Sequence, residues 1–150
     1  MISQTAEYSL RAMAYLADQM PQGYRSTIEV ATATKVPTPY LSKVLKRLVD
    51  IGLLKGQRGP GGGFLLMRTP ELITVWDVVD AVEPIKRITT CPLQLGSHAK
   101  VLCPLHRKLD NALAQLEKAF RETSLADLIN QPGAPQPLCD FVNSQRLPLS

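Results

Sequence analysis

Two cysteines and two histidines within residues 91–106 are the side chains of this sequence best suited to chemistry. Cys91 and Cys103 flank His98, and His106 follows Cys103 by three positions. Thiolates and imidazoles are ligands for zinc and iron, and imidazole can replace thiolate on one iron of a two-iron cluster. Two thiols can also form a reversible disulfide. The residues alone leave three interpretations open: a metal ligand set, a redox pair, or side chains with neither role.

The number and spacing of the cysteines narrow these possibilities. The chain has 3 cysteines, so they cannot all pair within one molecule, and a disulfide framework is not expected in a reducing compartment. A structural zinc site usually contains a short Cys-x2-4-Cys pair, which Cys91 and Cys103 do not form, so zinc is the least favoured metal. Cys139 lies among the prolines of residues 131–150 and is interpreted as having no ligand role.

Upstream of these residues, positions 38–52 have the pattern of a helix with one apolar and one basic face. Thr38 is a candidate N-cap, Pro39 fits the first helical position and Gly52 can end the helix. Apolar residues recur at helical spacing: Leu41, Val44, Leu45, Leu48 and Val49. The opposite face carries Ser42, Lys43, Lys46 and Arg47. A basic helix face is often only a solvated surface, so this helix alone does not indicate a function.

A glycine-rich segment that begins at Arg58 follows this helix almost directly. The flanking residues 53–55 and 64–67 are short apolar runs, which predicts two strands joined by the glycines. A nucleotide-binding P-loop would require Lys-Ser/Thr after the glycines, and this sequence has neither there. We therefore expect a β-ribbon, or wing, with Arg58, Gly59 and Gly61 near its tip.

A further helix is predicted before the basic one. Ser26 and Glu29 have the spacing of a capping box, and residues 35–37 form the turn that follows. Helix, turn, basic helix and hairpin over residues 26–68 is the order of a winged helix-turn-helix.

Positive charge is concentrated on this segment. Residues 35–68 contain seven Lys and Arg against Asp50 alone, a net +6, whereas the whole chain is +4, so the remainder sums to −2. A cationic patch on a groove-sized element is typical of proteins that bind double-stranded DNA. We expect phosphate contacts from Lys43, Lys46 and Arg47, base contacts from Tyr40, Ser42 and Lys43, and insertion of Arg58 into the minor groove, with Gly59 and Gly61 beside it.

The rest of the chain is predicted to be helical as well. A first helix has an apolar stripe that ends near residues 21–23. Thr74 and Asp77 form a capping box for a helix to about Glu83, with Trp76 in the core. Pro104 begins a long helix with one apolar side, and residues 123–129 form a short capped helix.

Two classes of protein are not expected. No hydrophobic run approaches the ~18 residues of a membrane span, and residues 1–4 lack the basic start of a secretion signal, so we expect a cytoplasmic protein with no membrane partner. No catalytic triad or carboxylate pair stands out, so an enzyme is not expected.

The motif that starts at Arg58, with Tyr40-Leu41 before it and residues 73–79 after it, resembles the Rrf-type winged-helix regulators of bacteria, a family that includes the iron-sulfur regulators IscR and NsrR. The similarity runs from about Ser3 to Ile129. It implies a mainly α fold: a winged helix-turn-helix with a two-stranded β wing and a long C-terminal dimerisation helix. It also implies a homodimer on a palindromic operator.

The same resemblance implies an organisation and a ligand set. The organisation is a DNA-binding domain over residues 1–83, a sensor loop over 84–103, dimerisation helices over 104–130 and a flexible tail over 131–150. Members that carry a cluster place three cysteines in the loop, and some add a histidine. Cys91 and Cys103 match the first and last of these cysteines, and His106 matches the histidine.

The middle cysteine of that pattern is missing. Ser97 stands near its position, so the adjacent His98 is a candidate replacement. Glu7 matches a carboxylate that the first helix of the other subunit supplies in some members. Two thiolates with two nitrogen or oxygen ligands favour a [2Fe-2S] cluster over a cubane, while a chain without the middle cysteine can also belong to the members without a cluster.

The resemblance therefore predicts a transcription regulator that senses redox state, nitric oxide or iron-sulfur status. One alternative is a cluster-free thiol-based redox regulator with the same fold. Another, from a different class, is a winged-helix module that binds protein. A cluster carrier or thiol redox enzyme is disfavoured by the +6 segment.

Overall fold

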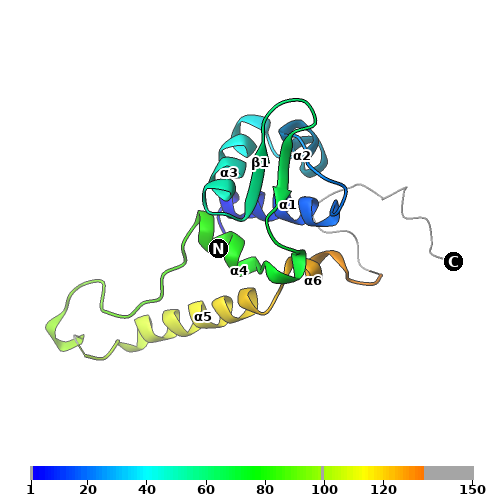
Figure 1. Cartoon of the computed structure of the whole chain (residues 1–150). Helices are drawn as coiled ribbons and strands as arrows, with labels where there is room; N and C mark the ends of the chain where they lie inside the picture. The colour runs from blue at the N-terminus through cyan, green and yellow to red at the C-terminus, as the bar shows by residue number, and fades with distance from the viewer. Residues whose placement is uncertain (1, 99, 134–150) are drawn as a thin grey trace.

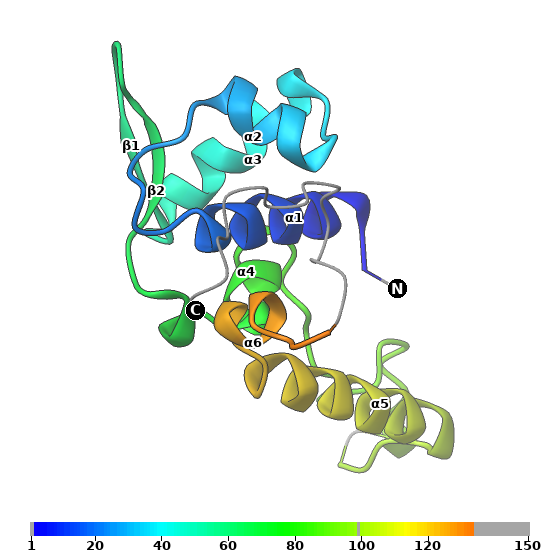
Figure 2. The same ribbon diagram turned by 90° about the vertical axis from the view of Figure 1, so that its right-hand side faces the viewer.

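The first half of the chain forms a helical unit with one hairpin. The computed structural model describes residues 2–98 and 100–133. Three helices, α1 (Gln4–Asp18), α2 (Thr27–Thr34) and α3 (Thr38–Asp50), precede the antiparallel strands β1 (Leu54–Gln57) and β2 (Gly63–Leu66). Figure 2 shows the hairpin standing beside the helices. The predicted mainly α fold with a two-stranded wing is confirmed.

The second half of the chain leaves this unit and returns to it. A short 3-10 turn, η1 (Pro70–Leu72), leads to α4 (Val75–Val82). Residues 84–103 are irregular apart from η2 (Gly96–His98) in the part that the structure describes. They are followed by α5 (Pro104–Arg121) and α6 (Leu125–Ile129). In Figure 1, α5 extends away from the other helices, with the irregular segment at its far end.

The main core lies between α1, α2, α3, α4 and α6. Its fully buried side chains come from all five helices and include Met13, Val30, Leu41, Leu45, Leu48, Val78 and Leu125. Trp76 is buried as well, as predicted. Because one face of α3 is held in this core, its opposite face is left at the surface.

Local capping signals set the starts of the helices. Ser26 with Glu29, and Thr74 with Asp77, both form the reciprocal capping boxes that their spacing predicts. Each box satisfies two backbone N–H groups that have no partner within the helix.

The start of α3 differs from the prediction by one residue. Pro37, not Thr38, occupies the N-cap position, with an extended backbone, and no side chain caps the helix. Lys35 adopts a left-handed conformation at the end of α2, so the turn is completed early and Thr38 is already helical. The other end is as predicted: Ile51 caps the helix and Gly52 follows with φ +86°.

The short helix α6 belongs to the part of the chain that is expected to form a dimer, and it also packs within its own chain. Leu125 lies fully buried in the main core. Its amide donates to the Ile73 carbonyl at 2.8 Å, and the Val75 amide donates to the Thr123 carbonyl at 2.8 Å. The chain after α5 is thus held against the start of α4 by backbone hydrogen bonds.

Candidate nucleic-acid interface and sensor segment

The exposed face of α3 carries the cationic residues that the sequence singled out. Lys43 and Lys46 are exposed, whereas Leu41, Leu45 and Leu48 on the opposite face are fully buried. The Ser42 hydroxyl is exposed too and donates to the Thr38 carbonyl at 3.0 Å. The helix is therefore fixed on one side and presents its amines on the other.

The wing is fixed at its base by close backbone contacts. The Arg25 amide donates to the Phe64 carbonyl at 3.0 Å, and the Phe64 amide donates to the Arg25 carbonyl at 2.8 Å. Gly63 has φ +141°, and a Cβ there would lie 2.2 Å from the Arg25 carbonyl oxygen. Only glycine allows this approach, so Gly63 lets the wing pack against Arg25, the residue before the N-cap of α2.

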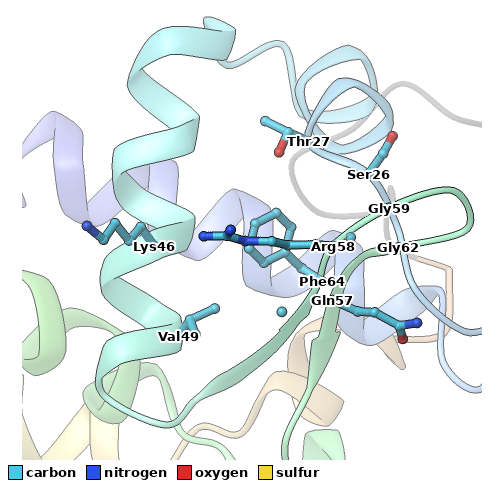
Figure 3. Close-up of a pocket in the computed structure, with 11 residues that line it drawn as sticks. Ser26, Thr27, Lys46, Val49, Gln57, Arg58, Gly59, Gly62 and Phe64 are labelled. Atoms are coloured by element: carbon cyan, nitrogen blue, oxygen red, sulfur yellow. The ribbon is translucent and has the colours of Figure 1, made fainter.

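A groove separates α3 from the wing. It has a volume of about 590 Å³, and residues from the start of α2, from α3 and from both sides of the hairpin line it. Apolar groups from Val49, Gly56 and Phe64 share the lining with the two cationic side chains Lys46 and Arg58. Figure 3 shows the Arg58 side chain extending from the wing towards α3. The groove thus has positive groups on both of its walls.

Two other DNA-binding candidates on α3 contact helices of their own chain. The Tyr40 hydroxyl shares a hydrogen bond with the Thr5 hydroxyl, and its ring packs edge-on against Tyr8 of α1 at 5.3 Å. Arg47 Nε donates to the Ala81 carbonyl of α4 at 3.0 Å. Sequence reasoning missed both contacts. The one available signal was that Tyr40 and Arg47 are two helical turns apart and share a flank of α3.

The sensor candidates come together only in part. Cys103 is the N-cap residue of α5, and its Sγ lies 3.3 Å from His106 Nδ1. Cys91 is buried, and neither of these thiols is in a disulfide in the described chain. Ser97 is exposed, and His98 lies in η2. Cys139 lies outside the described residues.

The fifth candidate, Glu7, already has a charged partner. Its carboxylate accepts hydrogen bonds from Arg11 Nε at 3.0 Å and Arg11 Nη2 at 2.8 Å. In the described part of one chain, no three Cys, His, Asp or Glu side chains converge as a metal site. The described side chains of one chain therefore do not by themselves form such a group.

An ionic cluster that the sequence did not reveal ties the irregular segment of residues 84–103 to α5. Arg87 forms a two-pronged pair with Asp110, with both N–O distances at 2.7 Å, and the Ile88 amide donates to the same carboxylate at 2.9 Å. The Arg87 guanidinium, helped by the Ile88 amide, lowers the pKa of Asp110, and Asp110 in turn raises the pKa of Arg87. The start of the segment is thereby bound to the middle of α5.

The α5 helix itself has an exposed apolar side. No residue of α5 is buried in the described chain, and Leu105 and Leu109 are 63% and 47% exposed. An 18-residue helix with such a side is unusual in a monomer, because exposed apolar patches commonly mark interaction sites.

The three-helix unit, the basic helix at its surface and the hairpin beside it define a winged helix-turn-helix DNA-binding protein. The chain belongs to the Rrf2 family of transcriptional regulators. The family model, described as an iron-dependent transcriptional regulator, matches residues 2–131.

Relatives and solved structures agree with this assignment. A protein of Aquifex aeolicus (strain VF5), named as an HTH-type transcriptional regulator, is 33% identical over 131 residues, which is 85% of this chain and 90% of that protein. A similarly named protein of Azotobacter vinelandii is 30% identical over 81% of this chain and 74% of its own length.

Two solved structures each match 85% of this chain. The global cysteine regulator CymR of B. subtilis has a TM-score of 0.71 and 27% identity, covering 85% of this chain and 95% of that one. T. potens IscR has a TM-score of 0.70 and 25% identity, covering 85% and 84%. The predicted family and fold are confirmed. In the described residues no helix is long and apolar enough to cross a membrane.

Proposed function

We propose that this regulator binds duplex DNA as a homodimer, with one sugar-phosphate strand of each half-site lying in the groove between α3 and the wing. The observation that carries the proposal is that groove, with Lys46 on its α3 wall and Arg58 on its wing wall. A helix in the major groove and a wing in the adjacent minor groove have one strand between them. Cations on both walls would neutralise its phosphates.

The individual roles follow from position. Lys43 and Lys46 contact phosphates, and Ser42 and Lys43 at the exposed start of α3 reach base edges. Arg58 enters the minor groove. Gly59 and Gly61, with φ +90° and +74°, shape the tip that carries it. This assignment leaves out Tyr40 and Arg47, which contact α1 and α4.

The dimer is supported by α5. Two copies related by a two-fold axis can cover each other's exposed Leu105 and Leu109, which one chain leaves at the surface. Such a pair presents two winged units to a palindromic operator with half-sites about 34 Å apart. Residues 104–130 are in this view the dimerisation part, although α6 also completes the core of its own chain.

Residues 84–103 are proposed as the segment that reads the signal. For a [2Fe-2S] cluster, Cys91, Cys103 and His106 would need further donors. The candidates are His98 of the same chain and the partner subunit's Glu7. A cluster-free thiol switch is supported by a different observation: Cys103 Sγ lies 3.3 Å from His106 Nδ1.

DNA binding is tested by salt titration of the homodimer on a palindromic duplex. Lys46→Ala removes one phosphate contact per subunit, so the slope of log K against log salt should shrink by about 1.8 for a dimer. Lys118→Ala is the matched control, because Lys118 is 75% exposed on α5, a helix that contributes no residue to the groove lining. An unchanged slope for Lys46→Ala would contradict the groove assignment. A wild-type protein that binds no duplex but captures a protein partner would instead identify an interaction module.

The signal is tested on protein purified without oxygen. Visible absorption with iron and sulfide assays detects a cluster, and substitution of Cys91 or Cys103 by serine should abolish it. A colourless, iron-free protein whose DNA affinity still changes on oxidation would select the thiol switch. Mass spectrometry would then show whether Cys91 and Cys103 become linked.

A further inference from the structure

The recognition helix α3 has two flanks with different surroundings. Lys46 faces the groove beside the wing, whereas Tyr40 and Arg47 contact α1 and α4 on the other side. A residue on this second flank can act on DNA by setting the position of α3 rather than by contacting the strand.

The contact of Arg47 with α4 is chemically well matched. Ala81 lies in the last turn of α4, where the helix ends at Val82. Carbonyl groups in the last turn have no partner within their helix and lie at the negative end of its dipole. A guanidinium N–H at 3.0 Å satisfies one of them and places positive charge where the dipole favours it.

The opposite end of α4 contacts α5. The Arg121 guanidinium lies 4.7 Å from the centre of the Trp76 ring, in the first turn of α4, and its Nε donates to Glu117 at 2.8 Å. Arg87, at the start of the sensor segment, lies 4.0 Å from the same Glu117. Helix α4 is thus contacted by Arg121 of α5 at its first turn and by Arg47 of the recognition helix α3 at its last turn.

We propose that Arg47 is a positioning residue that ties the recognition helix to the end of α4, so that a displacement of α5 reaches α3 through α4. This inference rests on the proposed DNA binding, which it extends by naming how the sensor half acts on the recognition helix. Arg47 contributes its Nε–H to the contact, and its charge is not spent on a DNA phosphate.

A neutral variant separates the two roles of this arginine. In Arg47→Gln the amide nitrogen is attached to Cδ, as Nε is in arginine, so an N–H can still reach the Ala81 carbonyl while the guanidinium charge is lost. The proposal expects Arg47→Gln to keep nearly wild-type affinity and salt slope. Arg47→Ala should bind roughly three- to tenfold more weakly with an unchanged slope.

The control for charge is Lys43→Gln on the exposed face of the same helix. For this variant, the slope of log K against log salt should fall by about 1.8 per dimer. Equal loss of affinity in Arg47→Gln and Arg47→Ala, with the slope reduced as in Lys43→Gln, would overturn the proposal and make Arg47 a phosphate contact. Circular dichroism establishes that Arg47→Ala is folded. If it is not, the comparison of Arg47→Gln with Lys43→Gln decides the question alone.

The transmission step has a spectroscopic readout. Trp76 is the only tryptophan of the chain, so its emission reports on α4 directly. DNA binding should shift this emission in the wild type and in Arg47→Gln but not in Arg47→Ala, even with DNA at saturation.

A double-mutant cycle then tests the link to α5. Arg121→Ala should change DNA affinity in the wild-type background and leave it unchanged in the Arg47→Ala background, whereas additive effects would refute transmission through α4. Wild-type protein that binds no duplex at all would overturn the proposed function itself. Additivity in a protein that does bind would overturn only the role of Arg47.

Discussion

Replacing Leu125 by alanine tests whether α6 stabilises its own chain or serves only a dimer. The Leu125 side chain is fully buried in the main core, and leucine-to-alanine changes at such sites cost about 2–5 kcal/mol because a cavity remains. The Leu125 amide is held by the Ile73 carbonyl at 2.8 Å, which limits collapse of the backbone into that cavity. We therefore expect a loss of roughly 3 kcal/mol in the free energy of unfolding.

The assay is urea or thermal unfolding followed by the emission of Trp76, at several protein concentrations. A loss of that size lowers the melting temperature by roughly 6–12 °C for a chain of this length. Leu93→Ala is the control, because Leu93 is 71% exposed in the sensor segment and its truncation should change stability by less than about 0.5 kcal/mol.

Protein concentration distinguishes the two roles of α6. A core residue lowers stability by the same amount at every concentration, whereas a residue that acts only at a dimer interface has an effect that depends on subunit association. If Leu125→Ala resembled Leu93→Ala, or if its effect changed with concentration, the placement of α6 in the core of its own chain would be refuted.

Three further predictions concern the wing, pH and assembly. Gly63→Ala forces a Cβ to within 2.2 Å of the Arg25 carbonyl oxygen, so it should destabilise the fold by about 1–3 kcal/mol and weaken DNA binding, measured by unfolding and anisotropy. The Ser124 amide and hydroxyl lower the pKa of Asp127 from its usual 3.8. A carboxyl group with a depressed pKa stabilises the fold at pH values above its pKa in the unfolded chain, and this contribution is lost as pH falls through its pKa in the folded chain. In Asp127→Asn the free energy of unfolding should therefore fall less steeply below about pH 4 than in the wild type. Leu109→Glu places a charge on the exposed side of α5 in both subunits and should yield monomers by sedimentation, with much weaker binding to a palindromic duplex; a dimer that persists would argue against α5 as the interface.

The features that the sequence predicted well depend on local chemistry. The capping box of Ser26 and Glu29 involves residues three positions apart, and Gly52 ends α3 through its own backbone conformation. The order of elements that identifies the winged fold is likewise a sum of such local signals. The start of α3 was misplaced by one residue, because the left-handed Lys35 is not marked by a glycine or an asparagine, and the bounds of both strands were shifted by one or two residues.

The features that were missed depend on which elements meet in space. Neither the contact of Arg47 with Ala81 nor the Arg87–Asp110 pair has a sequence pattern, since their partners lie 34 and 23 positions away. The apolar residues of α6 indicated burial, but their periodicity could not say whether the covering surface belonged to the same chain or to a partner.

For the sensor candidates, the sequence indicated the residue types but not their arrangement in space. Their residue types are those of ligands or redox groups, and Cys103 meets His106 because the two are one helical turn apart. Cys91 lies in irregular chain, so its distance to the others is set by the path of the segment and not by its spacing. Sequence could name these donors but could not assemble them.

The backbone pairing of Thr123 with Val75 brings the chain back to α4 after residues 84–122, which include the proposed sensor segment. The chain departs from one end of α4 and comes back to the other end, and the region between carries the cysteines and α5. A segment that begins and ends at the two ends of one short helix can be exchanged as a unit. During evolution, one DNA-binding module can in this way be combined with segments that respond to different signals. Chimaeras that exchange residues 84–122 between relatives should keep the promoter preference of the recipient and acquire the signal response of the donor.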